Sequence, residues 1–452
     1  MSPQPAAVQR LPGAPDLLAL HRAAPARYPF LLESGGEGGH GARWDILFAF
    51  PGERLVLDAD GGISGPHRGS GFLDSLDQWF AADRAAALPA RFPFNGGWFL
   101  YLGYELAAEI EPRLRLLRDA RLPTAVAVRC PVAVLREHES GGTWVVAEPG
   151  HEAALPRVVS DAAAAIPVAP RHAVLASGFT EDDDGRYLEC VAEARRYIRD
   201  GDVFQANLSR AWRGRLTDPV DPAALHALLR DANPAPFAGL ARFPVFAVVS
   251  SSPERLVEVR GTRVQTRPIA GTRPRAADPD RDRALVAELV ANPKERAEHV
   301  MLIDLERNDL SRVCLPGSVA VSEMMVVESY ATVHHIVSNV VGVRRPDATP
   351  GQVIRAVFPG GTITGCPKVR CMEIIAELER GPRGPYTGSI GYLDRAGDLD
   401  LNILIRSALV VGDALELRAG AGIVHESVPE RELEETRHKA RGLTRAWIPG
   451  GA

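Results

Sequence analysis

The sequence predicts an α+β protein built on a large, mostly antiparallel sheet system. Candidate strands and helices follow one another in blocks, without the regular strand–helix alternation that is typical of a parallel sheet. Strand-like segments at 246–250, 256–260 and 263–266, for example, follow one another directly. The chain has 452 residues, of which 46% are hydrophobic and 24% charged. This composition is typical of a folded chain and excludes wholesale disorder.

The first part of the chain is expected to contribute strands at 30–34, 44–50, 96–104, 126–135 and 143–147. An alanine-rich helix and a proline-containing stretch then run over 151–176. Composition changes most clearly there, so we expect the boundary between two regions, 1–170 and 171–452, in this stretch.

The second part is longer and more regularly patterned. Thr180 is expected to cap a helix that ends near 200, and Asn292 to cap a second helix that runs to about 308. Further helices are expected at 349–358, 367–378 and 429–445. Further strands are expected at 204–212, 246–250, 256–260, 263–266, 318–327, 329–341, 388–394, 400–411 and 416–420.

Composition excludes several classes of protein. The net charge of −5 argues against a broad nucleic-acid-binding surface. No apolar run reaches the roughly 18 residues that a membrane helix needs, and the first ten residues lack the apolar core of a signal peptide. The five cysteines (130, 190, 314, 366 and 371) form no C-x-x-C pair. They indicate reduced thiols and a cytoplasmic location.

Lysine is rare in this chain. Of the 52 basic residues only Lys294, Lys368 and Lys439 are lysine, and the others are arginine. A guanidinium cannot replace a compact ammonium group that binds a ligand or loses its proton. The three lysines are therefore either candidate site residues or ordinary surface lysines.

Acidic residues on two predicted helices suggest a metal site. Glu298 lies one turn after Lys294, and Glu435 lies one turn before Lys439. Together Glu298 and Glu435 would suit Mg²⁺, which takes few protein carboxylates, although each could equally belong to a solvated, salt-bridged helix face. Asp309 is unfavourable at a helix C-terminus, so we expect a function or a tertiary partner for it.

Glycine and arginine mark possible anion sites. Gly420, Ala421 and Gly422 follow a predicted strand and could present backbone amides to a carboxylate. The glycine-rich turn 360–368 enters a helix, whose N-terminus attracts anions. Arg406 lies within the apolar segment 401–409 and is expected to be either a carboxylate clamp or half of a structural ion pair.

Taken together, these segments resemble the chorismate-utilising enzymes, which include anthranilate synthase component I, aminodeoxychorismate synthase component I, and the isochorismate and salicylate synthases. The matching segments follow the family's order over about 180–445. They are G-D-V-F-Q-A-N-L-S, S-S-P-E-R-L, R-P-I-A-G-T-R-P-R, N-P-K-E-R-A-E-H-V-M-L-I-D-L-E-R-N-D-L, H-H-I-V-S, F-P-G-G-T-I-T-G-C-P-K-V-R-C-M-E-I-I, G-P-Y-T-G-S-I-G-Y, I-L-I-R-S, G-A-G-I-V and E-E-T-R-H-K-A. The N-terminal third is similar more loosely, through F-L-L-E-S, R-W-D-I-L-F-A and L-G-Y-E-L.

The resemblance implies a large two-sheet antiparallel β-sandwich with helices packed outside and a chorismate site deep between the sheets. Glu298 and Glu435 would hold Mg²⁺, which binds the substrate's ring carboxylate, and Glu254 would protonate the departing ring hydroxyl. The residues that would bind the substrate's carboxylates are Tyr386, Arg406, Gly420, Ala421, Gly422 and Lys439, and those that would line the ring are Thr272 and His335.

Position 205 separates members of the family. The water-using members resemble one another in placing a general-base lysine there, so Gln205 favours ammonia as the nucleophile. Asn207, Thr364, R-W-D-I-L-F-A and G-S-I-G-Y-L resemble aminodeoxychorismate synthase, whereas Ala270 resembles anthranilate synthase. Many aminodeoxychorismate synthases carry a nucleophilic lysine at position 270, and alanine cannot form that adduct.

These similarities favour an Mg²⁺-dependent enzyme that makes 4-amino-4-deoxychorismate for folate. The alternatives are an anthranilate synthase of the tryptophan pathway and a non-catalytic chorismate- or tryptophan-binding regulator. The resemblance also implies a separate glutaminase subunit that supplies ammonia. A tryptophan pocket bordered by Leu32, Glu33 and Ser34 is a further expectation, and a plain strand end is the alternative there.

Overall fold

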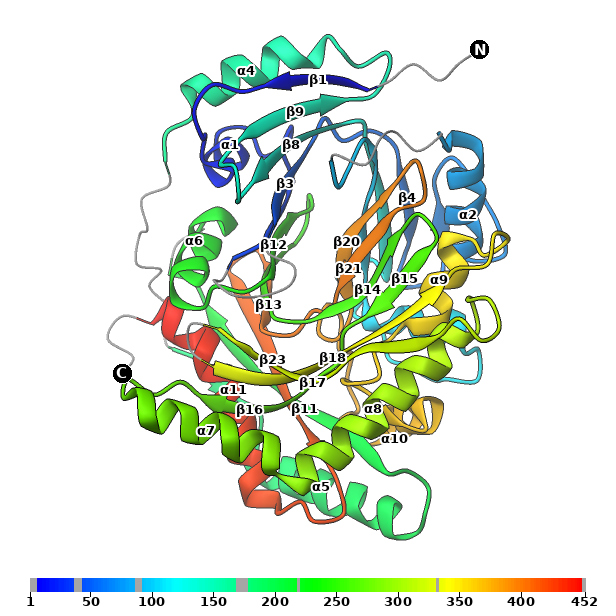
Figure 1. The fold of residues 1–452 in the computed structure, drawn as a ribbon, viewed down its shortest axis with the longest axis vertical. Helices are drawn as coiled ribbons and strands as arrows, with labels where there is room; N and C mark the ends of the chain where they lie inside the picture. The colour runs from blue at the N-terminus through cyan, green and yellow to red at the C-terminus, as the bar shows by residue number, and fades with distance from the viewer. Residues whose placement is uncertain are drawn as a thin grey trace.

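The computed structural model describes residues 6–35, 43–85, 92–167, 178–217, 220–330 and 333–448. Within these ranges the chain forms a 12-stranded and an 11-stranded sheet in which every pair of neighbouring strands is antiparallel (Figure 1). We call them the first and second sheet. The α+β class with two large antiparallel sheets is thus confirmed.

The first sheet runs in the order β1 (Ala7–Arg10), β9 (Thr143–Ala147), β8 (Val132–Glu137), β3 (Trp44–Ala49), β2 (Phe30–Glu33), β12 (Phe237–Arg242), β13 (Ala247–Ser252), β22 (Ser407–Val411), β23 (Ala414–Ile423), β11 (Gln205–Arg215) and β10 (Thr180–Glu181), with β19 (Gly365–Cys366) paired to β11. The second runs in the order β16 (Ile269–Pro274), β18 (Val333–Val343), β15 (Arg263–Thr266), β14 (Arg255–Arg260), β21 (Leu399–Asn402), β20 (Ser389–Asp394), β6 (Gly97–Leu102), β7 (Ala125–Cys130), β4 (Arg54–Leu57) and β5 (Ile63–Ser64), with β17 (Ala320–Ser329) paired to β18.

Helices cover the outer faces of the two sheets (Figure 1). They are α1 (Leu17–Ala23), α2 (Phe72–Asp83), α3 (Ala107–Ile110), α4 (Ala154–Ala164), α5 (Asp184–Arg199), α6 (Pro222–Ala232), α7 (Pro279–Ala291), α8 (Pro293–Ser311), α9 (Pro350–Val357), α10 (Lys368–Glu379) and α11 (Pro429–Trp447). Helices α6 and α11 pack on the first sheet, whereas α8 and α7 pack on the second.

An aromatic core joins the inner faces of the sheets. Phe30 of β2 stacks on Phe99 of β6 with ring centroids 4.0 Å apart, and Tyr101 of β6 meets Phe246 at 5.3 Å. All four side chains are buried. Burial of rings of this size contributes strongly to stability, because each removes a large apolar area from water.

Strands from both halves of the chain share each sheet. In the first sheet β2 pairs with β12, and in the second β6 pairs with β20. The expected division at residue 170 falls in 168–177, outside the described residues, so it stays a proposal. Both regions nevertheless contribute to one sandwich.

Two strands expected to be continuous are each divided between the sheets. The segment 126–135 breaks at Pro131 into β7 of the second sheet and β8 of the first. The segment 400–411 likewise breaks into β21 of the second sheet and β22 of the first. Because both sheets bury these segments, the apolar pattern continues through each crossing and hides the break. Arg406 therefore lies at a crossing, with φ of 51°, and not within a strand.

One predicted helix cap is wrong and another is confirmed. Thr180 belongs to β10, and the helix that follows is capped by Asp183, whose side chain accepts a hydrogen bond from the Arg186 amide at 2.7 Å. Asn292 caps α8, as expected, by accepting from the Lys294 amide at 3.0 Å. Asp183 is the better cap because it stands directly before the helix.

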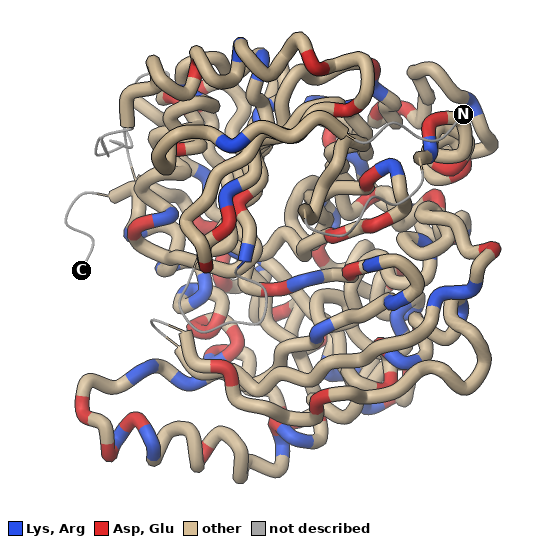
Figure 2. Tube along the Cα trace, turned by 45° about the horizontal axis from the view of Figure 1, so that its top comes forward, with Lys and Arg blue, Asp and Glu red and all other residues tan. Residues whose placement is uncertain are grey.

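Three further features concern the cysteines, membrane-spanning helices and the distribution of charge. None of the five cysteines forms a disulfide. Among the helices that the structure describes, none is long and apolar enough to cross a membrane. Acidic and basic residues are intermixed along the described chain (Figure 2).

Candidate active site

Two crossings between the sheets lie side by side and form the seam of the candidate site. One crossing, between β13 and β14, carries Glu254, and the other, between β21 and β22, carries Arg406. They are joined by backbone hydrogen bonds from Ser251 to Arg406 at 2.9 Å and from Ile403 to Glu254 at 3.0 Å. The fold thus places an acid and a guanidinium from distant segments on one seam.

Glu254 is held as a neutral acid at neutral pH. Its side chain is only 4% exposed, and burial raises the pKa of its carboxyl to about 8. The Thr362 hydroxyl donates to its Oε1 at 2.7 Å. A protonated carboxyl of this kind is suited to donate a proton to a leaving group. In the sequence Thr362 belongs to the glycine-rich turn 360–368, and only the structure shows its contact with the acid.

Arg406 is not half of an ion pair among the described residues, which leaves the expected carboxylate clamp as the open alternative. Its guanidinium donates to the Lys439 carbonyl at 3.3 Å, and no ion pair joins it to any described carboxylate. Burial lowers the pKa of its guanidinium, while the Tyr386 and Glu435 charges act the other way. A partly buried guanidinium without an anion carries a desolvation cost that a bound carboxylate would offset.

Gly420, Ala421 and Gly422 lie within β23, and not after a strand as expected. The Lys439 ammonium donates to the Gly420 carbonyl at 2.9 Å. The N–H and C=O of one strand residue point to the same side, and residues two apart share that side. The amides of Gly420 and Gly422 therefore face away from β11, on the side of Lys439, where they can receive an anion.

Glycine leaves room for polar side chains at both positions, where a Cβ would crowd them. A Cβ on Gly420 would lie 2.8 Å from the Tyr386 hydroxyl and 2.7 Å from Asn207 Oδ1. A Cβ on Gly422 would lie 2.6 Å from Gln205 Nε2. These glycines therefore admit three polar side chains to the same place.

The two carboxylates expected to hold a metal lie on α8 and α11, within reach of each other's charge. Burial raises the pKa of Glu298, and the charges of Glu435 and Glu432 add to this effect. Lys294 lies 3.7 Å from Glu298, and Lys439 lies 2.7 Å from Glu435. Mutually repelling carboxylates from two helices fit a divalent cation that keeps several water ligands.

Glu432 was not singled out by the sequence, although its spacing from Glu435 places both on one helix face. Within the described part of the chain, no three His, Cys, Asp or Glu side chains form a group that could hold a metal alone. The fit to Mg²⁺ therefore depends on ligands from water and substrate as well as Glu298 and Glu435.

Strands β16 and β18 supply the residues expected to line the ring. Thr272 and His335 are cross-strand partners, with Thr272 Oγ1 2.9 Å from His335 Nδ1. Burial lowers the pKa of His335 to about 4, so the imidazole is neutral at neutral pH. Ala270 pairs with Ile336 and provides no nucleophile.

Two side-chain amide oxygens on β11 lack a hydrogen-bond partner within the described structure. Gln205 Oε1 and Asn207 Oδ1 are buried without a hydrogen-bond partner. Such orphaned acceptors are rare in folded proteins and cost free energy unless a ligand or water satisfies them. Both lie beside the glycines of β23 and can accept N–H bonds from an incoming nucleophile or O–H bonds from a substrate.

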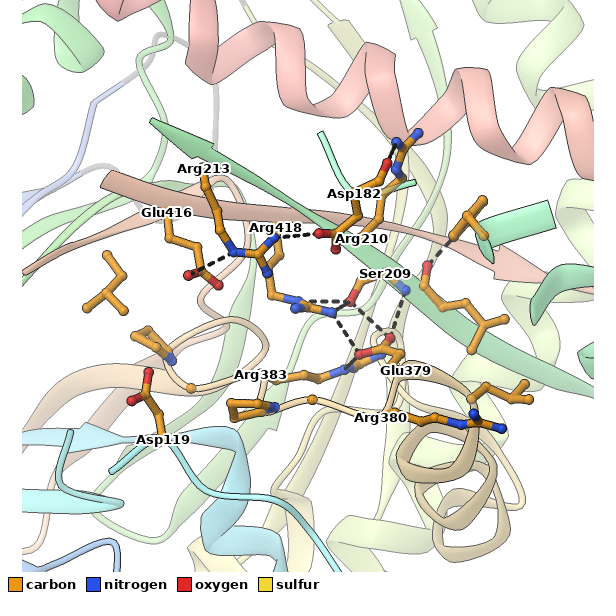
Figure 3. Close-up of a pocket in the computed structure, with 18 of the residues that line it drawn as sticks. Asp119, Asp182, Ser209, Arg210, Arg213, Glu379, Arg380, Arg383, Glu416 and Arg418 are labelled. Carbon is orange, nitrogen blue, oxygen red and sulfur yellow. Dashed lines mark hydrogen bonds and ion pairs between the residues drawn. The ribbon is translucent and has the colours of Figure 1, made fainter. Parts of the chain in front are cut away.

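A buried charge network, which the sequence did not reveal, binds the backbone of β11. Glu379 accepts from the Ser209 amide at 2.8 Å, from Arg383 at 2.6 Å and from Arg418 at 3.0 Å (Figure 3). Arg383 also donates to the Asn207 carbonyl at 2.7 Å. The network borders a cavity of about 490 Å³ and fixes the backbone that carries Asn207. Its only signal in the sequence was the i,i+4 spacing of Glu379 and Arg383.

Lys368 has a structural partner and not a ligand-binding role. Its ammonium is 2.6 Å from Asp309 Oδ2 and 3.0 Å from the Val357 carbonyl, and the Asp309 side chain is only 1% exposed. This pair supplies the tertiary partner expected for Asp309. Lys294 is half exposed and Lys439 about one-third exposed, so of the two lysines beside the expected metal carboxylates Lys439 is the more buried.

Leu32, Glu33 and Ser34 border a separate cavity of about 350 Å³. Glu33 accepts from His226 at 2.6 Å and from Arg230 at 3.1 Å. Although burial opposes it, the hydrogen bond from His226 lowers the pKa of Glu33, which is therefore ionised. The strand end is thus part of a cavity wall.

A protein-family model and several curated proteins match this chain in sequence. The family model for chorismate binding enzymes matches residues 30–445. An anthranilate synthase component I-like protein of Synechocystis is 42% identical over 362 residues, which cover 79% of this chain and 74% of that protein. Aminodeoxychorismate synthase component 1 of Bacillus subtilis is 41% identical over 375 residues, which cover 78% of each chain.

Solved structures extend the similarity to the whole fold. Anthranilate synthase component I from Streptococcus pneumoniae superposes with a TM-score of 0.80 and 30% identity, covering 90% of this chain and 93% of that one. The menaquinone-specific isochorismate synthase MenF from Escherichia coli, at 19% identity and a TM-score of 0.75, shares the fold. This chain therefore belongs to the chorismate-binding enzymes, as a chorismate-utilising enzyme of the anthranilate synthase and aminodeoxychorismate synthase type.

Proposed function

We propose that the chain aminates chorismate with ammonia, in the presence of Mg²⁺, to give 4-amino-4-deoxychorismate for the 4-aminobenzoate and folate pathway. The observation that carries this proposal is the neutral acid Glu254 on a seam that also holds Arg406, next to a position, Gln205, that lacks a general base. Departure of a ring hydroxyl requires an acid, and ammonia needs no base to attack.

Substrate binding is assigned to the donors around Arg406. Chorismate carries two carboxylates, and the Arg406 guanidinium, the Tyr386 hydroxyl and the amides of Gly420 and Gly422 supply donors for them. Burial raises the pKa of Tyr386 to about 12, so its hydroxyl stays protonated and donates. Lys439 is already bonded to Gly420 and Glu435 and adds positive charge at the same place.

Glu254 acts as the general acid. Its proton passes to the ring hydroxyl as the carbon–oxygen bond breaks and water leaves, while Thr362 holds the carboxyl in place. Glu298 and Glu435 would hold Mg²⁺, which when bound draws electron density from the ring carboxylate and so favours departure of the hydroxyl. The ammonia nitrogen forms the new bond and gives up a proton, which balances the proton lost with water.

Ammonia is favoured over water by the residues on β11. Gln205 and Asn207 present unpartnered acceptor oxygens, which can orient an N–H donor without removing a proton from it. We further propose that a separate glutaminase subunit supplies this ammonia. Copurification with the glutaminase and glutamine-dependent turnover would test that partner.

Amination at ring carbon 4 is favoured by the aminodeoxychorismate synthase-like segments around Asn207 and Thr364. Ala270 favours anthranilate, because the lysine nucleophile of many aminodeoxychorismate synthases is missing. The relatives carry both names at similar identity, so they do not choose between the products. With Ala270 in place, ammonia or another small nucleophile must make the addition.

The deciding experiment incubates the purified chain with chorismate, Mg²⁺ and ammonium and identifies the product by chromatography and mass spectrometry. We expect 4-amino-4-deoxychorismate and no pyruvate. Fluorescent anthranilate with equimolar pyruvate would overturn the product assignment. Chorismate binding without turnover at any ammonia concentration would instead support the regulator.

We also propose that the cavity beside Leu32, Glu33 and Ser34 binds tryptophan. Its walls combine apolar side chains with the Glu33 carboxylate, which can pair with an α-ammonium group. Titration calorimetry with tryptophan tests this, with Glu33→Gln as the variant expected to weaken binding. The free thiols support a proposed cytoplasmic location.

A further inference from the structure

A second buried acid lies close enough to Glu254 for its charge to act on it, and has no part in the mechanism above. Glu306 of α8 is 7% exposed, and its Oε1 would lie 3.5 Å from a Cβ on Gly361. Gly361 is the residue before Thr362, whose hydroxyl bonds Glu254. One short turn therefore touches both carboxyl groups, although they come from different parts of the chain.

Among the residues that the structure describes, none forms an ion pair with Glu306. The nearby ammonium of Lys368 is 2.6 Å from Asp309 and also bonds the Val357 carbonyl. Burial raises the pKa of Glu306 to about 7, and the charge of Asp309 adds to this effect. The charge of Lys368 and hydrogen bonds from Thr266 and the Gly361 backbone act the other way. A purely structural role would be filled better by an apolar side chain, since a buried carboxylate without an ion-pair partner is costly even when it is hydrogen-bonded.

We propose that Glu306 is a positioning residue for the general acid: from behind the Gly361–Thr362 turn, it keeps Glu254 in its proton-bearing form. The inference rests on the proposed role of Glu254 but not on the identity of the product, because either product requires loss of the same hydroxyl. The charged groups that act on Glu254 are Glu306 of α8, which favours the neutral acid, and Lys439 of α11, which opposes it.

The effect has a characteristic pH dependence. Above about pH 7 Glu306 ionises and its negative charge disfavours ionisation of Glu254, so the acid keeps its proton to higher pH. Below that pH Glu306 is neutral and has no such effect. Removing the negative charge of Glu306 should therefore lower activity only above about pH 7.

The test compares kcat/KM for chorismate in wild type and Glu306→Gln from pH 6 to pH 9, at saturating ammonium and Mg²⁺. The ratio of variant to wild type is used, so the pH dependence of the ammonia supply cancels. In the variant, the fall of kcat/KM at alkaline pH should begin about one pH unit lower than in wild type. The ratio of variant to wild-type kcat/KM is then near 1 at pH 6 and falls about eightfold by pH 8.5.

Two further variants separate this effect from a general loss of packing. Glu306→Asp keeps the charge and should recover most of the wild-type limb. Asp394→Asn removes another buried carboxyl, whose pKa is also raised to about 7 by burial but which does not act on Glu254, and should leave the limb unmoved. Should Glu306→Gln not fold, Glu306→Met carries the same expectation.

A ratio that stays constant from pH 6 to pH 9, in a folded variant that still turns over chorismate, would overturn the inference and leave the proposed function intact. Absence of ammonia-dependent turnover in the wild type would instead overturn the proposed function.

Discussion

Replacing Glu254 with glutamine is expected to stabilise the protein at neutral pH while it removes the general acid. The carboxyl has an ordinary pKa of 4.5 and a pKa of about 8 in the folded protein. Between these values the folded state holds a proton that the unfolded state has lost, so the free energy of unfolding falls as pH rises. Glutamine does not titrate and avoids this loss.

The size of the effect follows from the shift. At pH 7 the folded state loses up to 1.36 × (7 − 4.5), or about 3 kcal/mol, relative to a side chain that does not titrate. The stabilisation by glutamine should grow from below about 1 kcal/mol at pH 5 to about 4 kcal/mol at pH 8. For a chain of 452 residues, each kcal/mol corresponds to about 1 °C in Tm.

The assay is thermal unfolding of wild type and Glu254→Gln at pH 5, 6, 7 and 8, followed by circular dichroism. The exposed Glu434→Gln on α11 serves as the control, and its Tm difference should not grow with pH. In parallel, kcat should fall by about 10²- to 10⁴-fold in Glu254→Gln. A Tm difference that is constant from pH 5 to pH 8 would refute the claim that this carboxyl is protonated in the folded protein.

Three further predictions concern the metal, the nucleophile and the buried ion pair. Glu298→Gln should lose Mg²⁺-dependent activity and keep its circular dichroism spectrum, while turnover that saturates with Mg²⁺ as in wild type would defeat the metal assignment. Ala270→Lys should change the product ratio or accumulate a covalent adduct visible by intact mass, and an unchanged profile would show that position 270 does not steer the chemistry. Lys368→Met should lower the free energy of unfolding by about 3–5 kcal/mol, because it leaves Asp309 buried without its cation. Adding Asp309→Asn should recover most of that loss, and a loss from Lys368→Met too small to measure would count against the ion pair.

Much of the local structure was predictable because neighbouring residues determine it. Asn292 followed by Pro293 marked the start of α8, and Thr349 with Gln352 forms the capping box that begins α9. These features depend on side-chain-to-backbone bonds within one turn. The strands that remain within one sheet, such as β20, were also recognisable from their own sequence.

The crossings between sheets were not predictable in the same way. Residues 400–411 show continuous apolar character because the chain leaves one buried sheet and enters another without reaching solvent. Only the tertiary structure shows that Arg406 lies at that crossing with a positive φ, hydrogen-bonded beside the crossing that carries Glu254. The sequence does not show that these two crossings are neighbours, because they are about 150 residues apart in the chain.

The sequence by itself determined which residues are available for chemistry: three lysines among 52 basic residues, glutamates on two helices, and glutamine at position 205. Residue identity decides which groups can donate, accept or bind a cation. The tertiary structure alone decided the protonation and pairing of these groups. Burial keeps Glu254 protonated at neutral pH, and Asp309 holds Lys368 in a buried ion pair. Proton affinity and pairing depend on the solvent and charges around a group, which come from segments far apart in the chain.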